Sequence, residues 1–269
     1  MYWRHTRVIL PRAIMYPDAD ADQIAFFRSH GYLVVRQAVP QQDLDELEKH
    51  CDVLIAQKHE LANDWAWREG ESRENRTFRI VQSSPSKVWA DIAGQPYRHW
   101  LERFASQLMD LDMTFWYDQF LGKPPGHGAV TEWHQDEGYW GRNLDDRGIT
   151  GWIPLQDVDV VNGCMHFIDE GHRLGILPHH LVEGVQSDLL TCAVDESRTV
   201  VCPMRRGDVA FHHSKTPHMS TANQSAGWRK AVTNHLQQRD AGGEGDHYPW
   251  RVKVNQRTGE RKAVGAMGG

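Results

Sequence analysis

This sequence lacks the features that mark several common functional classes. It contains no run of about 18 apolar residues, so we expect no transmembrane helix in its 269 residues. The apolar stretch from Val8 to Leu10 is far too short for the core of a signal peptide. The formal net charge is −6, whereas nucleic-acid and anionic-membrane surfaces favour a basic surplus. We therefore expect neither a nucleic-acid partner nor a membrane partner.

Cysteine is scarce as well. The chain has 4 cysteines and none of them falls in a CxxC spacing, which favours reduced thiols in a cytoplasmic protein. Histidine and tryptophan are abundant instead, with 16 and 11 residues. The histidines make a metal site worth testing, although any single histidine is weak evidence. Most of the tryptophans are expected to pack in the core, and some to line a pocket.

The hydrophobic pattern predicts helices in the first part of the chain and short strands in the second. Apolar positions at helical spacing indicate helices over 18–30, 40–55 and 96–109. Short apolar runs at 32–35 and 78–82 indicate strands. After about Asp112, short apolar segments alternate with turn signals, which is typical of an antiparallel sandwich or barrel.

We therefore expect a mainly β fold with flanking helices, in a single domain over 1–269. The β core should span about 112–239, with a layer of helices and strands from 18–110 on its outside. Residues 63–76 carry charge and tryptophan without a clear period, and we interpret them as a loop that could cover a site. The polar, glycine-rich segment 240–269 is predicted to be a surface arm or to be partly disordered.

One short stretch, TEWHQDEGYW, places a histidine and a carboxylate two residues apart, at His134 and Asp136. If a strand continues through Asp136, both side chains face one side of the sheet and Gln135 faces the other. A third, distant histidine would complete a two-histidine, one-carboxylate triad, which leaves coordination positions open for iron and oxygen chemistry. Alone, this pattern is a weak signal and more often marks a solvated loop or a hydrogen-bonded polar pair than a metal site.

The third ligand is expected in the segment FHHSKTPHMS, which offers His212, His213 and His218. Spacing alone does not choose among them, and each is also compatible with a strand-end histidine bonded to the backbone. Downstream, Arg229 begins a predicted strand, with Lys230 pointing the opposite way. An arginine that faces a pocket binds a carboxylate through two charge-assisted hydrogen bonds, whereas the alternative is a surface arginine at a strand edge.

Four segments together resemble the phytanoyl-CoA dioxygenase family, over roughly Asp22 to Arg239. They are 133–136, 162–175, 205–225 and 228–232. The resemblance implies a double-stranded β-helix, or jelly-roll, core and an oxygenase that depends on Fe(II) and 2-oxoglutarate. One departure is that Asp169 and Glu170 stand where the family usually has proline and its neighbour. That motif mainly shapes a turn, so the departure leaves the implied iron site intact.

The resemblance also implies roles for single residues. It selects His218 as the third ligand, because a hydroxyl residue follows two positions later and an arginine eleven positions later. The implied iron ligands are His134, Asp136 and His218. The implied cosubstrate residues are Arg229 and Ser220 at the far carboxylate, with Trp152 and Gln135 lining the site and Arg79 as a further basic candidate. The candidate substrate contacts are Trp140, Tyr139 and Trp65, and core packing is the alternative for each of them.

The predicted activity is oxidation of an unactivated C–H bond of a small molecule, with O2 consumed and succinate and CO2 released. Hydroxylation, cyclisation and epimerisation of a specialised metabolite all fit, whereas the carboxylate at Asp136 disfavours halogenation. Two alternatives remain. A cupin-like metalloenzyme that uses no 2-oxoglutarate needs the triad but not Arg229, and a catalytically inactive jelly-roll binding protein needs neither. The sequence leaves the substrate and the oligomeric state open.

Overall fold

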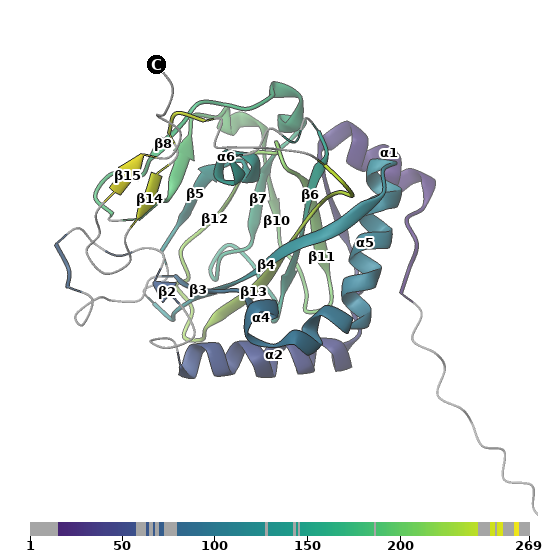
Figure 1. The fold of residues 1–269 in the computed structure, drawn as a ribbon, viewed down its shortest axis with the longest axis horizontal. Helices are drawn as coiled ribbons and strands as arrows, with labels where there is room; N and C mark the ends of the chain where they lie inside the picture. Colours follow the sequence, from purple (N-terminus) through teal and green to yellow (C-terminus); the bar gives the residue numbers. More distant parts are fainter. Residues whose placement is uncertain are drawn as a thin grey trace, which may run out of the picture.

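Two antiparallel β-sheets face each other in a computed structural model of the chain, with the longer helices on the outside (Figure 1). The structure describes residues 16–57, 63–64, 67, 70–72, 80–126, 129–141, 144, 146–185, 187–241, 248–250, 252–254 and 261–263. Among these residues, no helix is both long and apolar enough to cross a lipid bilayer. The arrangement is the jelly-roll core that the resemblance implied.

The larger sheet has seven strands, and the smaller sheet has four. The order in the larger sheet is β1 (Tyr32–Val35), β11 (Val209–His213), β6 (Gly148–Pro154), β13 (Arg229–Gln238), β4 (Met113–Lys123), β3 (Val81–Ser83) and β2 (Asn63–Asp64). The order in the smaller sheet is β10 (Thr199–Cys202), β7 (Met165–Ile168), β12 (His218–Ser220) and β5 (Thr131–His134). Two further pairs are β8 (His179–Leu181) with β9 (Leu190–Cys192), and β14 (Val252–Val254) with β15 (Arg261–Ala263).

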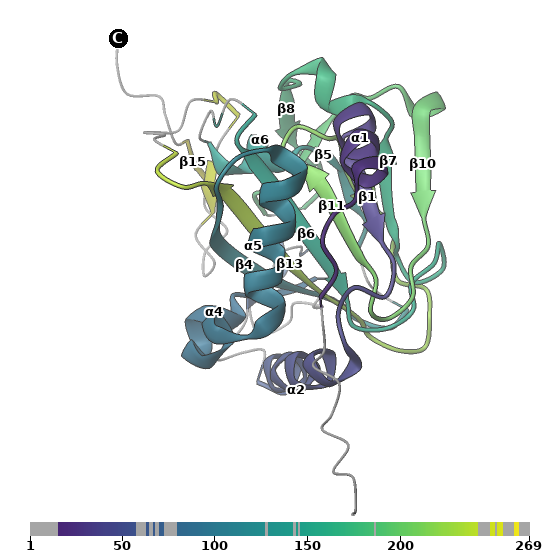
Figure 2. The ribbon, with the colours of Figure 1, turned by 90° about the vertical axis from the view of Figure 1, so that its right-hand side faces the viewer.

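The helices pack on the outer face of the larger sheet (Figure 2). They are α1 (Ala21–His30), α2 (Gln41–Ala56), α4 (Pro85–Val88) and α5 (Pro96–Met109), with the 3-10 turn η2 (Ala90–Gly94) before α5. The short helix α6 (Asp136–Trp140) lies apart from them and follows β5. Two more 3-10 turns, η3 (Gly171–Leu174) and η4 (Glu196–Arg198), follow β7 and precede β10. Phe104 of α5 stacks on Phe211 of β11, with ring centroids 5.1 Å apart. Because side chains alternate along a strand, the next residue, His212, faces the space between the sheets.

Between the sheets lies a second apolar cluster, which holds the two layers together. Phe167 of β7 stacks on Tyr32 of β1 at 4.9 Å between ring centroids, and Trp152 of β6 belongs to the same cluster. Apolar side chains that interdigitate from the two inner faces stabilise a sheet-on-sheet contact, and aromatic pairs add to this. This cluster borders the polar residues described below, because its members Trp152 and Met165 also line their cavity.

The element predictions hold closely in the first half of the chain. The strand 32–35 and the helix 96–109 have the predicted bounds, and the helix expected from 18 begins at Ala21 with Asp20 as its cap. The segment expected to lie outside the core, however, also contributes to it, because β1 and β3 hydrogen-bond in the larger sheet. Most of the segment 63–76 lies outside the described residues.

Candidate metal and cosubstrate site

The site is built on the inner face of the larger sheet, where pairing aligns side chains from neighbouring strands. His212 of β11 pairs with Thr150 of β6, Thr150 pairs with His235 of β13, and His235 pairs with Tyr117 of β4. Residues opposite each other in an antiparallel sheet point to the same face. A row of four polar or aromatic side chains therefore crosses the sheet and faces the smaller one.

The predicted triad comes together opposite this row. His134 is the last residue of β5 and His218 the first of β12, and the two residues are paired across the smaller sheet. The Oδ1 atom of Asp136 lies 3.6 Å from Nε2 of His218 and 4.0 Å from Nε2 of His134. One ligand atom from each of the three residues lies within 4.8 Å of the others, and all three residues are buried. A divalent metal bound by imidazole and carboxylate needs this spacing.

The backbone around the triad differs from the prediction. The strand ends at His134 instead of continuing through Asp136, which is the first residue of the short helix α6. No helix was predicted at this point. Gly138 within this helix serves a close contact, since a Cβ at Gly138 would lie 2.8 Å from the ring of His179. The helix therefore lies tightly against β8, which fixes the position of Asp136.

Hydrogen bonds to the backbone orient the two ligand histidines. Nδ1 of His134 lies 2.7 Å from the carbonyl of Glu132, and Nδ1 of His218 lies 2.9 Å from the carbonyl of Thr216. A carbonyl oxygen only accepts hydrogen bonds, so both Nδ1 atoms carry the proton and both Nε2 atoms are unprotonated. Bare Nε2 atoms aimed at one point, with Nδ1 held by the backbone, are the arrangement that metal-binding histidines adopt.

His212 and His213, the other two candidates for the third ligand, have different roles. Nε2 of His212 lies 3.0 Å from Oδ2 of Asp136, and because an ionised carboxylate only accepts, this nitrogen donates. It therefore has no lone pair for a metal. His213 lies outside the cavity lining, with Nε2 3.6 Å from Asp146. The geometry thus agrees with the resemblance in selecting His218.

The charges around the triad favour an ionised Asp136 and neutral histidines. Burial alone would raise the pKa of Asp136, but His218, His212 and His235 outweigh it and hold this pKa well below its usual range. Burial, followed by the neighbouring histidines His134 and His212, holds the pKa of His218 well below its usual value. An anionic carboxylate beside two neutral imidazoles is the protonation state that binds a metal cation.

A second group of residues, at the far end of the cavity, is built to hold an anion. Arg229 is buried, its NH1 donates to the carbonyl of Leu121, and its Nε has no hydrogen-bond partner among the described residues. Burial lowers the pKa of Arg229 to about 10, so the guanidinium remains charged. A buried cation with an unused donor is costly unless an anion binds. Ser220 lines the same end of the cavity.

Lys123 joins this group and was not predicted. It lies opposite Arg229 in the sheet, is fully buried, and its Nζ donates to Oγ of Ser220 at 2.8 Å and to two backbone carbonyls. Burial, followed by the charge of Arg229, holds the pKa of Lys123 well below its usual value. The sequence gives one weak signal for it, which is that Lys123 lies two residues after Leu121 at the end of an alternating strand.

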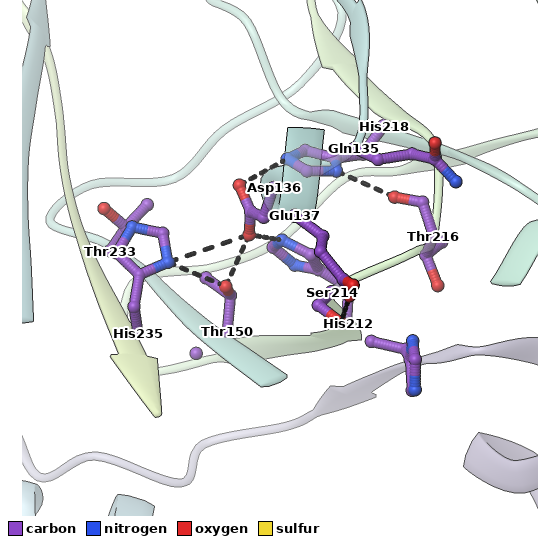
Figure 3. A network of polar contacts seen from close by, with 12 residues as sticks. Gln135, Asp136, Glu137, Thr150, His212, Ser214, Thr216, His218, Thr233 and His235 are labelled. Carbon is purple, nitrogen blue, oxygen red and sulfur yellow. Dashed lines mark hydrogen bonds and ion pairs between the residues drawn. The ribbon is translucent and has the colours of Figure 1, made fainter. Parts of the chain in front are cut away.

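The structure places the other two predicted cosubstrate residues that it describes, Trp152 and Gln135, differently. Trp152 lines the cavity, with its ring centroid 5.8 Å from the guanidinium carbon of Arg229. Gln135 does not line it. Its amide nitrogen donates to the carbonyls of Gly175 and Lys215, so the side chain points away from Asp136 and ties two loops together (Figure 3). The structure thus gives Gln135 a structural role where a cosubstrate contact was expected. Arg79 lies outside the described residues.

One cavity of about 210 Å³ connects the triad to the anion-binding end and opens toward a mixed aromatic and polar wall. Trp140 and Tyr139, two of the candidate substrate contacts, belong to α6 and both line this cavity. Trp65 lies outside the described residues. The wall also includes Gln82, Tyr117, Gln119, Asp188 and His235.

Part of the predicted surface arm contacts the helix that carries Asp136. Nε1 of Trp250 donates to the carbonyl of Gly138 at 3.2 Å, and its ring lies 5.3 Å from that of His179. Tyr248 stacks on Trp250 and reaches Glu137, the residue after Asp136. These described residues of the C-terminal segment therefore brace α6 from outside.

Comparisons with known proteins find a matching family model, similar sequences and similar structures. Residues 27–231 match the family model for phytanoyl-CoA dioxygenase (PhyH). A probable phytanoyl-CoA dioxygenase of Caenorhabditis elegans is 24% identical over 232 residues, which cover 80% of this chain and 74% of the relative. The crystal structure of EvdO2 from Micromonospora carbonacea var. aurantiaca, complexed with 2-oxoglutarate, has a TM-score of 0.69 at 25% identity and covers 88% of this chain and 98% of its own. SnoK, a non-heme alpha ketoglutarate dependent carbocyclase from nogalamycin biosynthesis, shares the fold with a TM-score of 0.65 at 22% identity, over 84% of this chain and 87% of SnoK.

Proposed function

The chain belongs to the phytanoyl-CoA dioxygenase family and is a non-haem Fe(II)- and 2-oxoglutarate-dependent oxygenase, and we propose that it oxidises an unactivated C–H bond of a small specialised metabolite. The observation that carries the proposal is the pairing of two features in one cavity. A buried metal triad lies at its centre, and a buried cation with an unused donor, Arg229, lies at its far end. A dicarboxylate that chelates the metal at one end and meets the guanidinium at the other matches both features.

Each residue of the site then has a defined task. His134, Asp136 and His218 hold the iron on one side and leave its other positions open. The bound iron and 2-oxoglutarate supply oxygen activation, with succinate and CO2 as the products of the cosubstrate. Arg229 binds the far carboxylate, and Lys123 holds Ser220 beside it.

Apolar side chains define the channel between these two ends. Trp152 and Met165 line the cavity, and Trp152 also belongs to the apolar cluster between the sheets. With 2-oxoglutarate bound, these apolar side chains would exclude water from the reacting centre. A water-poor site strengthens the charge interactions at Arg229 and protects reactive species from side reactions.

The wall on the open side of the triad supports the substrate class. It combines the aromatic rings of Tyr117 and Trp140 with the side-chain amide of Gln119 and the carboxylate of Asp188. Among the described residues that line the cavity, Arg229 at the cosubstrate end is the one lysine or arginine. The described lining therefore offers no second lysine or arginine to bind the phosphates of a coenzyme A thioester. This lining fits a partly apolar molecule that carries hydroxyl or amino groups. Hydroxylation and ring closure both remain compatible with it.

A coupled assay tests the proposal. Purified protein is given Fe(II), 2-oxoglutarate and O2 with a panel of hydroxylated ring compounds, and succinate is measured together with oxidised product. We expect succinate in proportion to product for at least one member of the panel. Product formation without succinate would favour the cupin-like enzyme that uses no 2-oxoglutarate. Absence of Fe(II) binding would favour the inactive binding protein.

Location is a further proposal. All four cysteines are buried free thiols. Unpaired cysteines are typical of proteins in reducing compartments, and we propose that the protein acts in the cytoplasm. Cell fractionation with an antibody to the protein would test this.

A further inference from the structure

The two oxygens of Asp136 have different surroundings. Oδ1 faces the Nε2 atoms of His134 and His218, whereas Oδ2 is engaged by residues outside the triad. Oγ1 of Thr150 lies 2.5 Å from Oδ2, and Nε2 of His212 lies 3.0 Å from it (Figure 3). Both neighbours donate, because an ionised carboxylate only accepts hydrogen bonds. Oδ2 thus receives two strong hydrogen bonds directed away from the metal side.

The single hydroxyl proton of Thr150 is committed to this contact. Nδ1 of His235 lies 2.9 Å from the same hydroxyl oxygen, so it must be the donor of that second hydrogen bond. The ring of His235 lies 4.3 Å from that of Tyr117, and its Nε2 lies 3.2 Å from Oε1 of Gln119. With the proton on Nδ1, Nε2 accepts, so the Gln119 amide is assigned with its nitrogen toward His235. The Thr150 hydroxyl is fully buried between two strands and cannot turn to another acceptor without losing both contacts.

This arrangement affects how a metal is bound. A carboxylate binds a metal through one oxygen or through both. If Asp136 bound through both, it would occupy one of the positions that a facial triad leaves open for chelating 2-oxoglutarate and for oxygen. Hydrogen bonds that hold Oδ2 prevent this. Outer contacts of this kind orient metal ligands and tune the site.

We propose that Thr150 is a positioning residue that keeps Asp136 a one-oxygen ligand and so preserves the coordination positions that the cosubstrate needs. The inference rests on the proposed function and adds a residue that neither the motif nor the triad contains. Thr150 acts through Asp136, and its hydroxyl is the group that matters.

Two substitutions separate the hydroxyl from the shape of the side chain. Thr150→Val keeps the branched shape and the strand preference but removes the donor, and Thr150→Ser keeps the donor. Each variant and the wild type are loaded with Fe(II) without oxygen and titrated with 2-oxoglutarate, and the weak visible metal-to-ligand charge-transfer band is recorded. We expect the affinity of T150V for 2-oxoglutarate to fall by about 10–100-fold with a weakened band, while T150S stays close to wild type.

A second measurement distinguishes positioning from a packing defect. Thermal protection of the metal-free protein by millimolar 2-oxoglutarate reports binding at Arg229 alone, so T150V should retain the wild-type value. Loss of this protection in T150V, or an unchanged charge-transfer titration in T150V, would overturn the proposal. Absence of the band from the wild type is a different result, because it would contradict the proposed function itself.

Discussion

Replacement of Arg229 by methionine is the substitution with the most direct consequence for cosubstrate binding. Arg229 is 2% exposed, and its Nε has no partner among the described residues. Truncating one partner of a buried, hydrogen-bonded charge pair costs about 2–5 kcal/mol. Since Ser220, held by Lys123, remains beside the carboxylate, we take a value of about 3 kcal/mol, which is roughly a 150-fold rise in KM for 2-oxoglutarate.

The same substitution should not weaken the resting protein. Without an anion, Arg229 is a desolvated cation, and an apolar side chain of similar length removes the cost of burying it. We expect the Tm of R229M without 2-oxoglutarate to equal or exceed that of the wild type. The rise in Tm that 2-oxoglutarate causes in the wild type should disappear.

Lys230→Met is the matched control, because it removes a positive charge from the next residue of the same strand. Lys230 faces outward and forms ion pairs with Glu48 and Asp52 of α2. K230M should lower Tm slightly and leave KM for 2-oxoglutarate unchanged. Steady-state succinate formation at varied 2-oxoglutarate gives both constants. A wild-type KM in R229M, or an equal rise in K230M, would refute the reasoning.

Three further substitutions test other parts of the site. Lys123→Met should raise KM for 2-oxoglutarate by about tenfold with little change in kcat, because Ser220 loses a charged donor worth about 1.5 kcal/mol. Succinate release measures both constants, and an unchanged KM would exclude Lys123 from the anion site. Gly138→Ala should lower the free energy of unfolding in urea by about 1–3 kcal/mol and weaken Fe(II) binding, because the new methyl group clashes with His179. Wild-type stability and Fe(II) affinity in this variant would show that α6 is not tightly held. Trp250→Ala should raise KM for the substrate more than KM for 2-oxoglutarate, since it frees the outer side of α6, and equal changes in the two constants would contradict this.

Much of the site could be read from the sequence because its signals are local. The pair His134 and Asp136 stands out at two-residue spacing and Arg229 begins a predicted strand, while the family resemblance supplied their roles. The choice of His218 over His212 could not be made from spacing, because it depends on contacts between distant segments. His218 pairs with His134 across two strands, while His212 donates to Asp136.

The errors have physical reasons as well. Lys123 precedes two prolines and a glycine, a context that favours a solvated turn, and only the pairing of β4 with β13 places it beside Arg229. Gln135 was assigned to the active site by the family resemblance, but its side chain turns to loop carbonyls instead. The helix at Asp136 was missed because glycine is normally unfavourable in helices. Here, close packing against His179 requires it.

The central claim is that His134, Asp136 and His218 hold Fe(II) while 2-oxoglutarate bridges the metal and Arg229. Its most direct test is the addition of one equivalent of Fe(II) and then 2-oxoglutarate to the folded protein without oxygen, followed by visible spectroscopy. The account predicts a weak charge-transfer band that saturates with 2-oxoglutarate, is absent from His218→Ala, and needs far more 2-oxoglutarate in R229M. A well-folded wild-type protein that shows no such band would contradict it.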